Sequence, residues 1–430
     1  MVMNFIYYQE VRALSRIVVN GGKKLSGTVK IHGAKNAVLP ILAATVMAEG
    51  VHKIHNCPEL SDVSVTCEIL KELGAHVARD GDTLIVDTSG PMESFIPERL
   101  MRKLRSSVIF LGAVLARKKE AKISAPGGCE LGPRPIDLHI KALKELGAEI
   151  KEEHGYLICR ADNLKGKDIH LDIPSVGATE NIMLAACAAS GKTVISNAAR
   201  EPEIEDLADF LNSMGAEISG AGTSTVEIVG GAKLTPSEYR VMPDRIVAAT
   251  YLCAAAATGG TITVTDVCTE HLSAILAVLS DCGCKIIKEK ESVTLFAPSL
   301  LKSPTSIKTM PYPGFPTDAQ SLFLAMLAKS DGTTIITETI FESRFKAAGE
   351  LLRMGAKINI NSRVAVIKGI NKLSGACVSA QDLRGGAALV IAALSAEGLT
   401  IINSPEFIYR GYENFEKNLR LLGADITYEG

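Results

Sequence analysis

A short phrase recurs six times along the chain: an apolar residue, then Gly, then a small residue, then an alternating stretch typical of a β-strand. The phrase predicts a helix end, because the residue just past a helix often turns left-handed, which Gly does at little steric cost. Successive glycines are 68 to 73 residues apart. The copies are Leu73-Gly74-Ala75, Leu146-Gly147-Ala148, Met214-Gly215-Ala216, Cys282-Gly283-Cys284, Met354-Gly355-Ala356 and Leu422-Gly423-Ala424. The chain therefore consists of six copies of one unit of about 70 residues.

The elements before each phrase are also shared. An extended segment, such as Thr28 to His32, precedes an Ala-rich helix; a second strand, such as Val51 to His55, follows, and then a more amphipathic helix ends at the Gly. The Ala-rich helices are apolar on almost every side, so they must be buried. They are Ala37 to Ala48, Thr179 to Ala189, Ile246 to Ala257 and Gly386 to Ala396. The predicted unit is βαβαββ.

A helix that is apolar all round cannot be buried by its own unit, so several units must enclose their helices together. A chain of 430 residues is too long for one core and fits two domains of about 200 residues. We expect an α/β protein with two domains of three units each, sheets facing outward and helices inward.

Composition is typical of a cytoplasmic enzyme. The net charge is −2, with 46 basic and 48 acidic residues scattered along the chain, so neither nucleic acid nor an anionic membrane is an expected partner. The apolar segments are too short to span a bilayer, and Met1 to Leu14 carries polar residues where a signal peptide needs an apolar run. The ten cysteines are dispersed and lack partners at metal spacing, so we predict no disulfide framework, no metal site and no cofactor.

One cysteine differs from the others. Cys129 lies in a stretch with three Gly and three Pro, from Ala125 to Pro135, which must be an irregular loop inserted into the second unit. Insertions on repeat proteins commonly carry function, and Arg134 lies five residues away, where it could stabilise a thiolate. A structural loop and a reactive cysteine are both open readings of this segment.

Cations recur at equivalent edges of different units, mostly where a strand meets a helix. Each alone is typical of a solvated surface charge. Together they predict a cleft for a substrate with several anionic groups, because pseudo-symmetric domains would bring equivalent loops together. They are Lys35, Arg105, Arg134, Arg344, Arg384 and Arg410.

Six ordered motifs carry a family resemblance over almost the whole chain. They are Gly33-Ala34-Lys35-Asn36-Ala37, Pro126-Gly127-Gly128-Cys129 with Arg134 to His139, Ser175 to Thr179, Ala199 to Glu203, Phe315-Pro316-Thr317-Asp318 and Arg410-Gly411-Tyr412-Glu413. With them the chain resembles the UDP-N-acetylglucosamine 1-carboxyvinyltransferases, which are enolpyruvyl transferases. The resemblance implies a two-domain inside-out α/β barrel, with domains at 35–242 and at 1–34 plus 243–430, and an active site in the cleft between them.

The resemblance also implies a reaction: transfer of the enolpyruvyl group of phosphoenolpyruvate to the 3-hydroxyl of UDP-N-acetylglucosamine through a tetrahedral ketal, with release of phosphate, as the committed step of peptidoglycan synthesis. It implies that Cys129 is the proton donor or transient nucleophile and the target of the covalent inhibitor fosfomycin. Asp318 matches the general base near the sugar hydroxyl, and an N-cap for a helix beginning at Ala319 is a compatible second role. We expect a monomer.

The remaining matches are substrate contacts. The resemblance assigns phosphoenolpyruvate contacts to Lys35, Arg134 and Arg410, of which Lys35 and Arg410 also count as catalytic. It assigns the nucleotide-sugar side to Arg105 and to the run Arg134, Pro135, Ile136, Asp137 and Leu138. Further matches are Asn36, Ser175, Val176, Gly177, Ile340, Arg344 and Arg384.

Two rival functions are left open. One is a 5-enolpyruvylshikimate 3-phosphate synthase, with the same fold and donor but another acceptor; the Pro-Gly-Gly-Cys loop and the Arg134 to Leu138 run argue against it. The other is a catalytically inactive regulator that binds a nucleotide sugar, which would be expected to lack Cys129 or Asp318.

Overall fold

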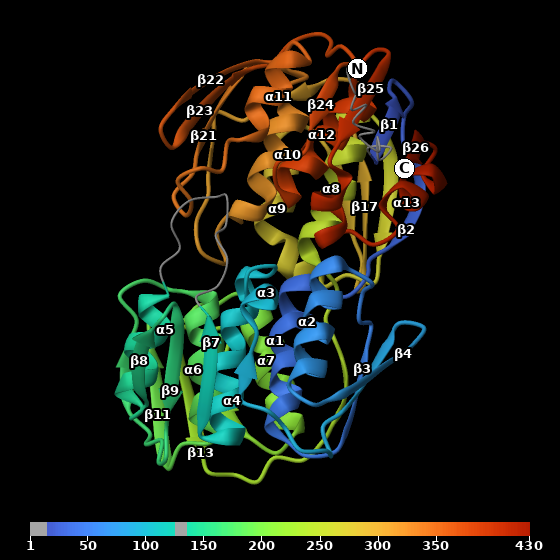
Figure 1. The fold of residues 1–430 in the computed structure, drawn as a ribbon. Helices are drawn as coiled ribbons and strands as arrows, with labels where there is room; N and C mark the ends of the chain where they lie inside the picture. Colours follow the sequence, from blue (N-terminus) through green and yellow to red (C-terminus); the bar gives the residue numbers. More distant parts are fainter. Residues whose placement is uncertain (1–14, 125–135) are drawn as a thin grey trace, which may run out of the picture.

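The computed structural model describes residues 15–124 and 136–430. Two hydrophobic cores organise it (Figure 1). The first core is built from buried residues between Ala34 and Val241. The second combines a segment from Ile17 to Ile31 with residues from Ile246 to Ile426. Cys129, Arg134, Pro135 and the segment Met1 to Leu14 lie outside the described residues.

Six four-stranded sheets repeat one topology. In each, the first two strands are parallel and the remaining neighbours are antiparallel. The first core carries β14 (Glu238–Arg240), β3 (Val51–His55), β5 (Thr83–Asp87) and β4 (His76–Asp80); β6 (Phe95–Ile96), β7 (Glu120–Ser124), β9 (Tyr156–Arg160) and β8 (Glu149–Glu153); and β10 (Asp168–His170), β11 (Gly191–Ser196), β13 (Thr225–Gly230) and β12 (Glu217–Ser219).

The second core carries the other three sheets. They are β2 (Ser26–Lys30), β15 (Thr261–Thr265), β17 (Ser292–Phe296) and β16 (Lys285–Lys288); β19 (Ser306–Lys308), β21 (Thr333–Thr337), β23 (Val364–Lys368) and β22 (Lys357–Asn361); and β24 (Cys377–Ser379), β25 (Leu399–Asn403), β1 (Arg16–Asn20) and β26 (Asp425–Glu429). A small parallel pair joins β18 (Leu301–Lys302) to β20 (Ser330–Asp331).

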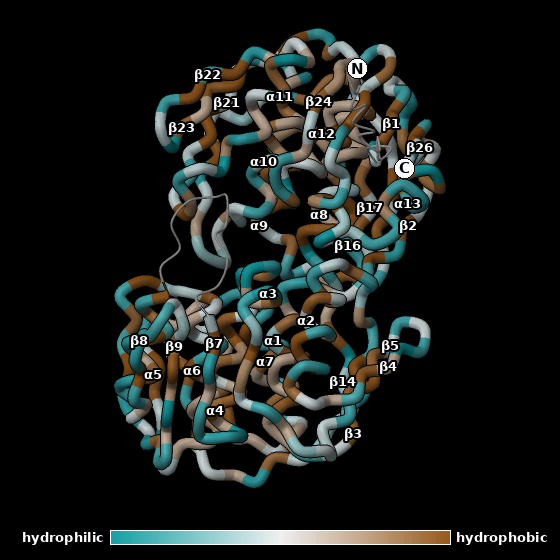
Figure 2. The backbone as a smooth tube through the Cα atoms, in the orientation of Figure 1, coloured by the Kyte–Doolittle hydropathy of each residue, from teal (hydrophilic) through white to brown (hydrophobic). Residues whose placement is uncertain are grey.

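The predicted apolar helices lie inside these sheets (Figure 1). In α8 (Arg245–Thr258) every residue from Ile246 to Ala257 is buried. The other inner helices are α1 (Lys35–Ala44), α4 (Phe110–Lys118), α6 (Val176–Cys187), α10 (Thr317–Leu327) and α12 (Leu383–Ser395). Hydrophobic stretches run through the strands and inner helices, whereas peripheral turns are mostly hydrophilic (Figure 2). The inside-out α/β arrangement is therefore confirmed.

The six repeated phrases end the second helix of each unit. All six glycines have φ between +89° and +101°. At the first, the N–H of Ala75 donates to the carbonyl of Leu70 and the N–H of Gly74 to that of Lys71, which is a Schellman motif, and the other five repeat this pattern. The helices are α2 (Ser61–Glu72), α5 (Asp137–Glu145), α7 (Pro202–Ser213), α9 (Ser273–Asp281), α11 (Ala347–Arg353) and α13 (Phe415–Leu421).

Short helices complete the chain. They are α3 (Glu98–Met101) and the 3-10 helices η1 (Thr45–Met47), η2 (Arg105–Ile109), η3 (Thr269–Leu272) and η4 (Pro405–Arg410). The predicted helix from Ala37 to Ala48 is thus α1 followed by a 3-10 turn. The predicted strand from Thr28 to His32 is β2, two residues earlier, because His32 already belongs to the connection between the cores.

The chain passes twice between the cores, and the two connections lie side by side. The N–H of Ala34 donates to the carbonyl of Met242 at 2.7 Å, and the N–H of Asp244 donates to the carbonyl of His32 at 2.9 Å. Strand β2 therefore leads into α1 of the first core, while β14 leads into α8 of the second. Lys35 begins α1 directly at this junction.

Candidate active site

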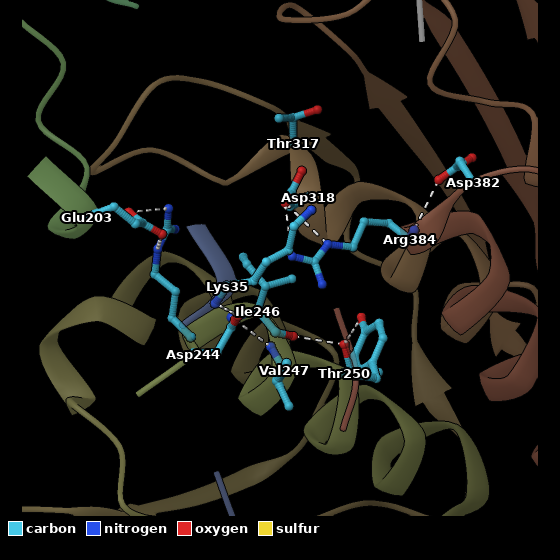
Figure 3. A network of polar contacts seen from close by, with 12 residues as sticks. Lys35, Glu203, Asp244, Ile246, Val247, Thr250, Thr317, Asp318, Asp382 and Arg384 are labelled. Carbon is cyan, nitrogen blue, oxygen red and sulfur yellow. Dashed lines mark hydrogen bonds and ion pairs between the residues drawn. The ribbon is translucent and has the colours of Figure 1, made fainter. Parts of the chain in front are cut away.

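Asp318 and two arginines form the first group of predicted site residues. Arg344 Nη2 donates to Asp318 Oδ1 at 2.7 Å. Arg384 donates to Asp318 Oδ2 through Nε at 3.2 Å and Nη2 at 3.1 Å (Figure 3). Both arginines are almost fully buried, whereas 27% of the Asp318 side chain is exposed. A carboxylate held by two buried cations therefore has one face toward solvent.

The charge state of Asp318 follows from this arrangement. Burial alone would raise the pKa of Asp318, but the positive charges of Arg384, Arg344 and Lys35 outweigh burial and hold the pKa well below its usual range. Asp318 is thus a carboxylate at every physiological pH.

The second role predicted for Asp318, an N-cap, is wrong. Helix α10 begins at Thr317, its N-cap position is Pro316, and no side chain caps it. Asp318 therefore lies within the first turn, where a negative charge is stabilised by the helix dipole.

Neighbouring residues fix the segments that carry Arg384 and Arg344. Asp382 is the N-cap of α12, where its Oδ1 accepts the backbone N–H groups of Arg384 and Gly385 at 3.0 and 2.8 Å. The Arg384 guanidinium also lies over the Tyr412 ring, 5.5 Å from its centroid. Buried Glu338 accepts from the Thr317 hydroxyl at 2.9 Å and from the N–H of Ile340 at 2.7 Å. It thereby ties the start of α10 to the loop that carries Ile340 and leads to Arg344.

Lys35 and Arg410 form the second group, and they meet at a residue that the sequence did not identify. Lys35 Nζ lies 2.7 Å from Asp62 Oδ2, and Arg410 Nε lies 2.9 Å from Asp62 Oδ1. Asp62 lies in the first turn of α2, and Arg410 ends η4 on the other core. The structure thus brings together two of the predicted cations from opposite cores.

The third group surrounds His139 and Asn181 in the first core. Arg105 begins η2, and Ile136 is the N-cap of α5, whose first residues are Asp137 and Leu138. Ser175 is the N-cap of α6, which begins with Val176 and Gly177. Asn181 of α6 contacts η2 and α5, because its Nδ2 donates to the carbonyl of Val108 at 3.0 Å and contacts His139 Nδ1 at 3.0 Å. Its Oδ1 accepts the N–H of Gly112 in α4 at 2.6 Å. Burial lowers the pKa of His139 to about 4, so its ring is neutral.

Other predicted positions are less closely tied to these groups. Asn36 is exposed in the first turn of α1. Within residues 15–124 and 136–430, His139 and Asn181 contact other residues of the first core, whereas Asp318 accepts from Arg344 and Arg384 of the second core. Cavities of about 100 and 200 Å³ open near the junction, and neither is lined by a predicted site residue. Both are small for a nucleotide sugar.

A further ion pair at the junction was not predicted. Arg245, the first residue of α8, donates to Glu203 of α7 through Nε at 3.2 Å and Nη2 at 3.3 Å. Figure 3 labels Glu203. The sequence contained a signal for Glu203, since it lies in the Ala199 to Glu203 motif, but none for Arg245. Like Arg410 and Asp62, this pair connects the two cores.

Several known proteins are similar to this chain in sequence over most of its length. The family model described as EPSP synthase (3-phosphoshikimate 1-carboxyvinyltransferase) matches residues 19–419. UDP-N-acetylglucosamine 1-carboxyvinyltransferase 2 of Caldanaerobacter subterraneus subsp. tengcongensis is 54% identical over 414 residues, covering 96% of this chain and 99% of that protein. The enzyme of the same name from Geobacter metallireducens is 47% identical over 413 residues, covering 96% of this chain and 99% of that protein. The chain belongs to the UDP-N-acetylglucosamine 1-carboxyvinyltransferase family.

Solved structures agree with this family assignment. The enolpyruvyl transferase NikO from Streptomyces tendae is 26% identical, with a TM-score of 0.88 over 96% of this chain and 99% of that chain. An EPSP synthase from Acinetobacter baumannii has a TM-score of 0.76 at 20% identity over 96% of this chain and 100% of that chain, which shows a shared fold. No helix among the described residues of this carboxyvinyltransferase is both long enough and apolar enough to cross a membrane.

Proposed function

We propose that the protein transfers the enolpyruvyl group of phosphoenolpyruvate to the 3-hydroxyl of UDP-N-acetylglucosamine. A bond forms between the sugar oxygen and C2 of the donor, and the bond from C2 to the phosphate oxygen breaks. The hydroxyl proton passes to a base, the methylene carbon is protonated transiently, and its proton is lost as phosphate leaves. The product is a precursor of peptidoglycan, and we place the reaction in the cytoplasm.

The observation that carries this function is the near full-length identity to carboxyvinyltransferases that use UDP-N-acetylglucosamine by name. The charges of the site suit this reaction. Phosphoenolpyruvate carries a phosphate and a carboxylate, and the cations Lys35 and Arg410 from the two cores would neutralise them.

We assign roles to the site residues as follows. Lys35 and Arg410, together with Arg134, neutralise the donor. Arg105, the segment Arg134 to Leu138, Asn36, Ile340 and Ser175 to Gly177 contact the nucleotide sugar. Arg344 and Arg384 hold Asp318 beside the reacting hydroxyl. Each oxygen of Asp318 accepts from an arginine, and the solvent-exposed side of the carboxylate leaves acceptor capacity for the sugar hydroxyl.

We further propose that the two cores are domains, 35–242 and 1–34 plus 243–430, which close over the substrates, and that the protein acts as a monomer. Cys129 would protonate the methylene carbon or attack C2 transiently, and fosfomycin would alkylate its thiol. Peptide mass spectrometry of the inactivated protein tests the alkylation: a modified peptide containing Cys129 is expected, and inactivation with this peptide unmodified would refute it.

A competition experiment tests the function itself. The protein is incubated with phosphoenolpyruvate and equal amounts of UDP-N-acetylglucosamine and shikimate 3-phosphate, and the products are separated by mass. The enolpyruvyl group should appear on the nucleotide sugar alone. Its appearance on shikimate 3-phosphate would favour the rival enzyme, and absence of both products would favour a regulator that only binds.

A further inference from the structure

Asp62 occupies a position between the two proposed donor-binding cations. Its Oδ2 lies 2.7 Å from Lys35 Nζ and 3.4 Å from Arg410 Nη2, and its Oδ1 lies 2.9 Å from Arg410 Nε. Lys35 begins α1 of the first core, whereas Arg410 belongs to the second. One carboxylate therefore sets the separation of two cations that the fold brings from opposite sides.

The order of exposure places this carboxylate behind the cations. Only 4% of the Asp62 side chain is exposed, against 12% for Lys35 and 36% for Arg410. An anion that arrives from solvent therefore meets the guanidinium and the ammonium before it reaches Asp62. Asp62 accepts one contact from the Lys35 ammonium and two from the Arg410 guanidinium. The remaining N–H groups of both cations can still bind an anion on the solvent side.

The charge of Asp62 is secured by its surroundings. Burial would raise its pKa, but the charges of Lys35 and Arg410 and the hydrogen bonds that they donate lower the pKa below its ordinary value. Its place in the first turn of α2 adds the favourable helix dipole. Without this negative charge, the positive charges of Lys35 and Arg410 would repel each other.

We propose that Asp62 is a positioning residue for the phosphoenolpyruvate site: it holds Lys35 and Arg410 in register when the cores approach, and so couples donor binding to closure. This inference rests on the proposed function, because it takes the two cations as contacts of the donor. It differs from the opposite possibility, in which Asp62 competes with the donor for the cations.

The two possibilities predict opposite changes in the KM for phosphoenolpyruvate when Asp62 is replaced by Asn. A positioning role predicts a KM for phosphoenolpyruvate raised about tenfold or more, as expected when a charged hydrogen-bond partner is lost. The KM for UDP-N-acetylglucosamine should stay within about twofold, which also shows that the variant is folded. Asp62→Glu, which keeps the charge, should recover part of the loss. Glu68→Gln is the matched control, because Glu68 is an exposed ion-pair carboxylate on the same helix, and it should leave both constants unchanged.

A lower KM for phosphoenolpyruvate in Asp62→Asn would overturn the proposal, as would equal losses for donor and acceptor. Binding of inorganic phosphate, measured by isothermal titration calorimetry, gives a test that needs no turnover: the wild type should bind phosphate more tightly than Asp62→Asn. Failure of the wild type to turn over the two substrates would count against the proposed function, whereas equal phosphate affinity in the two proteins would count against the role of Asp62.

Discussion

The backbone N–H of Lys35 donates a hydrogen bond of 3.1 Å to Asp244 Oδ2, and this contact joins the two segments in which the chain passes between its cores. The other oxygen of Asp244 accepts the N–H groups of Ile246 and Val247 at 2.8 and 3.0 Å, as the N-cap of α8. A single carboxylate therefore orders the start of one inner helix and the first residue of another. Since Lys35 is a proposed donor contact, the structural junction and the site share this residue.

Replacing Asp244 tests this junction. Asp244→Ala removes the cap of α8 and the acceptor of a backbone N–H, and the free energy of unfolding should fall by about 2 to 4 kcal/mol. Asp244→Asn keeps the oxygen that caps α8 but loses the acceptor of the Lys35 N–H, so it should cost less than Asp244→Ala. Chemical denaturation of the two variants and the wild type measures the difference. Equal losses would mean that the charge, and not the cap, stabilises the junction.

Asp318 is expected to matter for turnover far more than for binding. Asp318→Ala removes the proposed base and leaves Arg344 and Arg384 without their shared partner, so kcat should fall by about 100-fold or more. Binding of UDP-N-acetylglucosamine, followed by calorimetry, should weaken by less than about threefold, because most of its proposed contacts lie in the first core. Asp331→Ala, at an exposed aspartate of the second core, is the control. Parallel losses of kcat and affinity would point to a purely structural role.

Asp206 should make the protein less stable as pH rises. Its carboxyl accepts from the Tyr239 hydroxyl at 2.8 Å and from the N–H of Met242 at 3.3 Å, next to the second connection between the cores. Burial raises the pKa of Asp206 to about 7. Between its unfolded pKa near 4 and pH 7, the folded state therefore binds more protons than the unfolded state, and stability decreases with increasing pH.

The measurement is denaturant unfolding at pH 5 and pH 8. The wild type should lose a few kcal/mol over this interval, which is the order set by a shift of this size. Asp206→Asn, which cannot ionise, should show a flatter dependence. The same pH dependence in both proteins would exclude Asp206 as its source.

Closure of the two proposed domains should be visible in solution. The predicted site residues lie on both cores, so a nucleotide sugar that contacts both should draw the cores together. Small-angle scattering should record a smaller radius of gyration after UDP-N-acetylglucosamine is added. An unchanged radius would indicate that the site is already formed without substrate.

The repeat made most of the architecture predictable. Each Gly in the six phrases has a left-handed backbone conformation that ends a helix through hydrogen bonds within the same turn. The helix ends could therefore be predicted without knowledge of the tertiary structure. The pairing of β1 with β25 and β26 could not be placed in this way, because it joins residues about 400 positions apart. It closes the last sheet with a strand from the beginning of the chain.

The site was predictable only in part. The cations and Asp318 lie in recognisable motifs, but Asp62 is one acidic residue in an ordinary amphipathic helix. Its importance comes from Arg410, which is 348 residues away in sequence. The ion pair of Glu203 with Arg245 likewise depends on the side-by-side connections of the cores. Such contacts are properties of the folded junction and leave no local pattern.

The central claim is that cations from both cores serve one site. Steady-state phosphate release with phosphoenolpyruvate and UDP-N-acetylglucosamine tests it most directly, with Lys35→Ala for the first core and Arg344→Ala for the second. Both variants should lose about 100-fold or more in kcat/KM, while the exposed control Lys372→Ala keeps the wild-type value. Wild-type kcat/KM in either Lys35→Ala or Arg344→Ala would contradict a site shared between the cores.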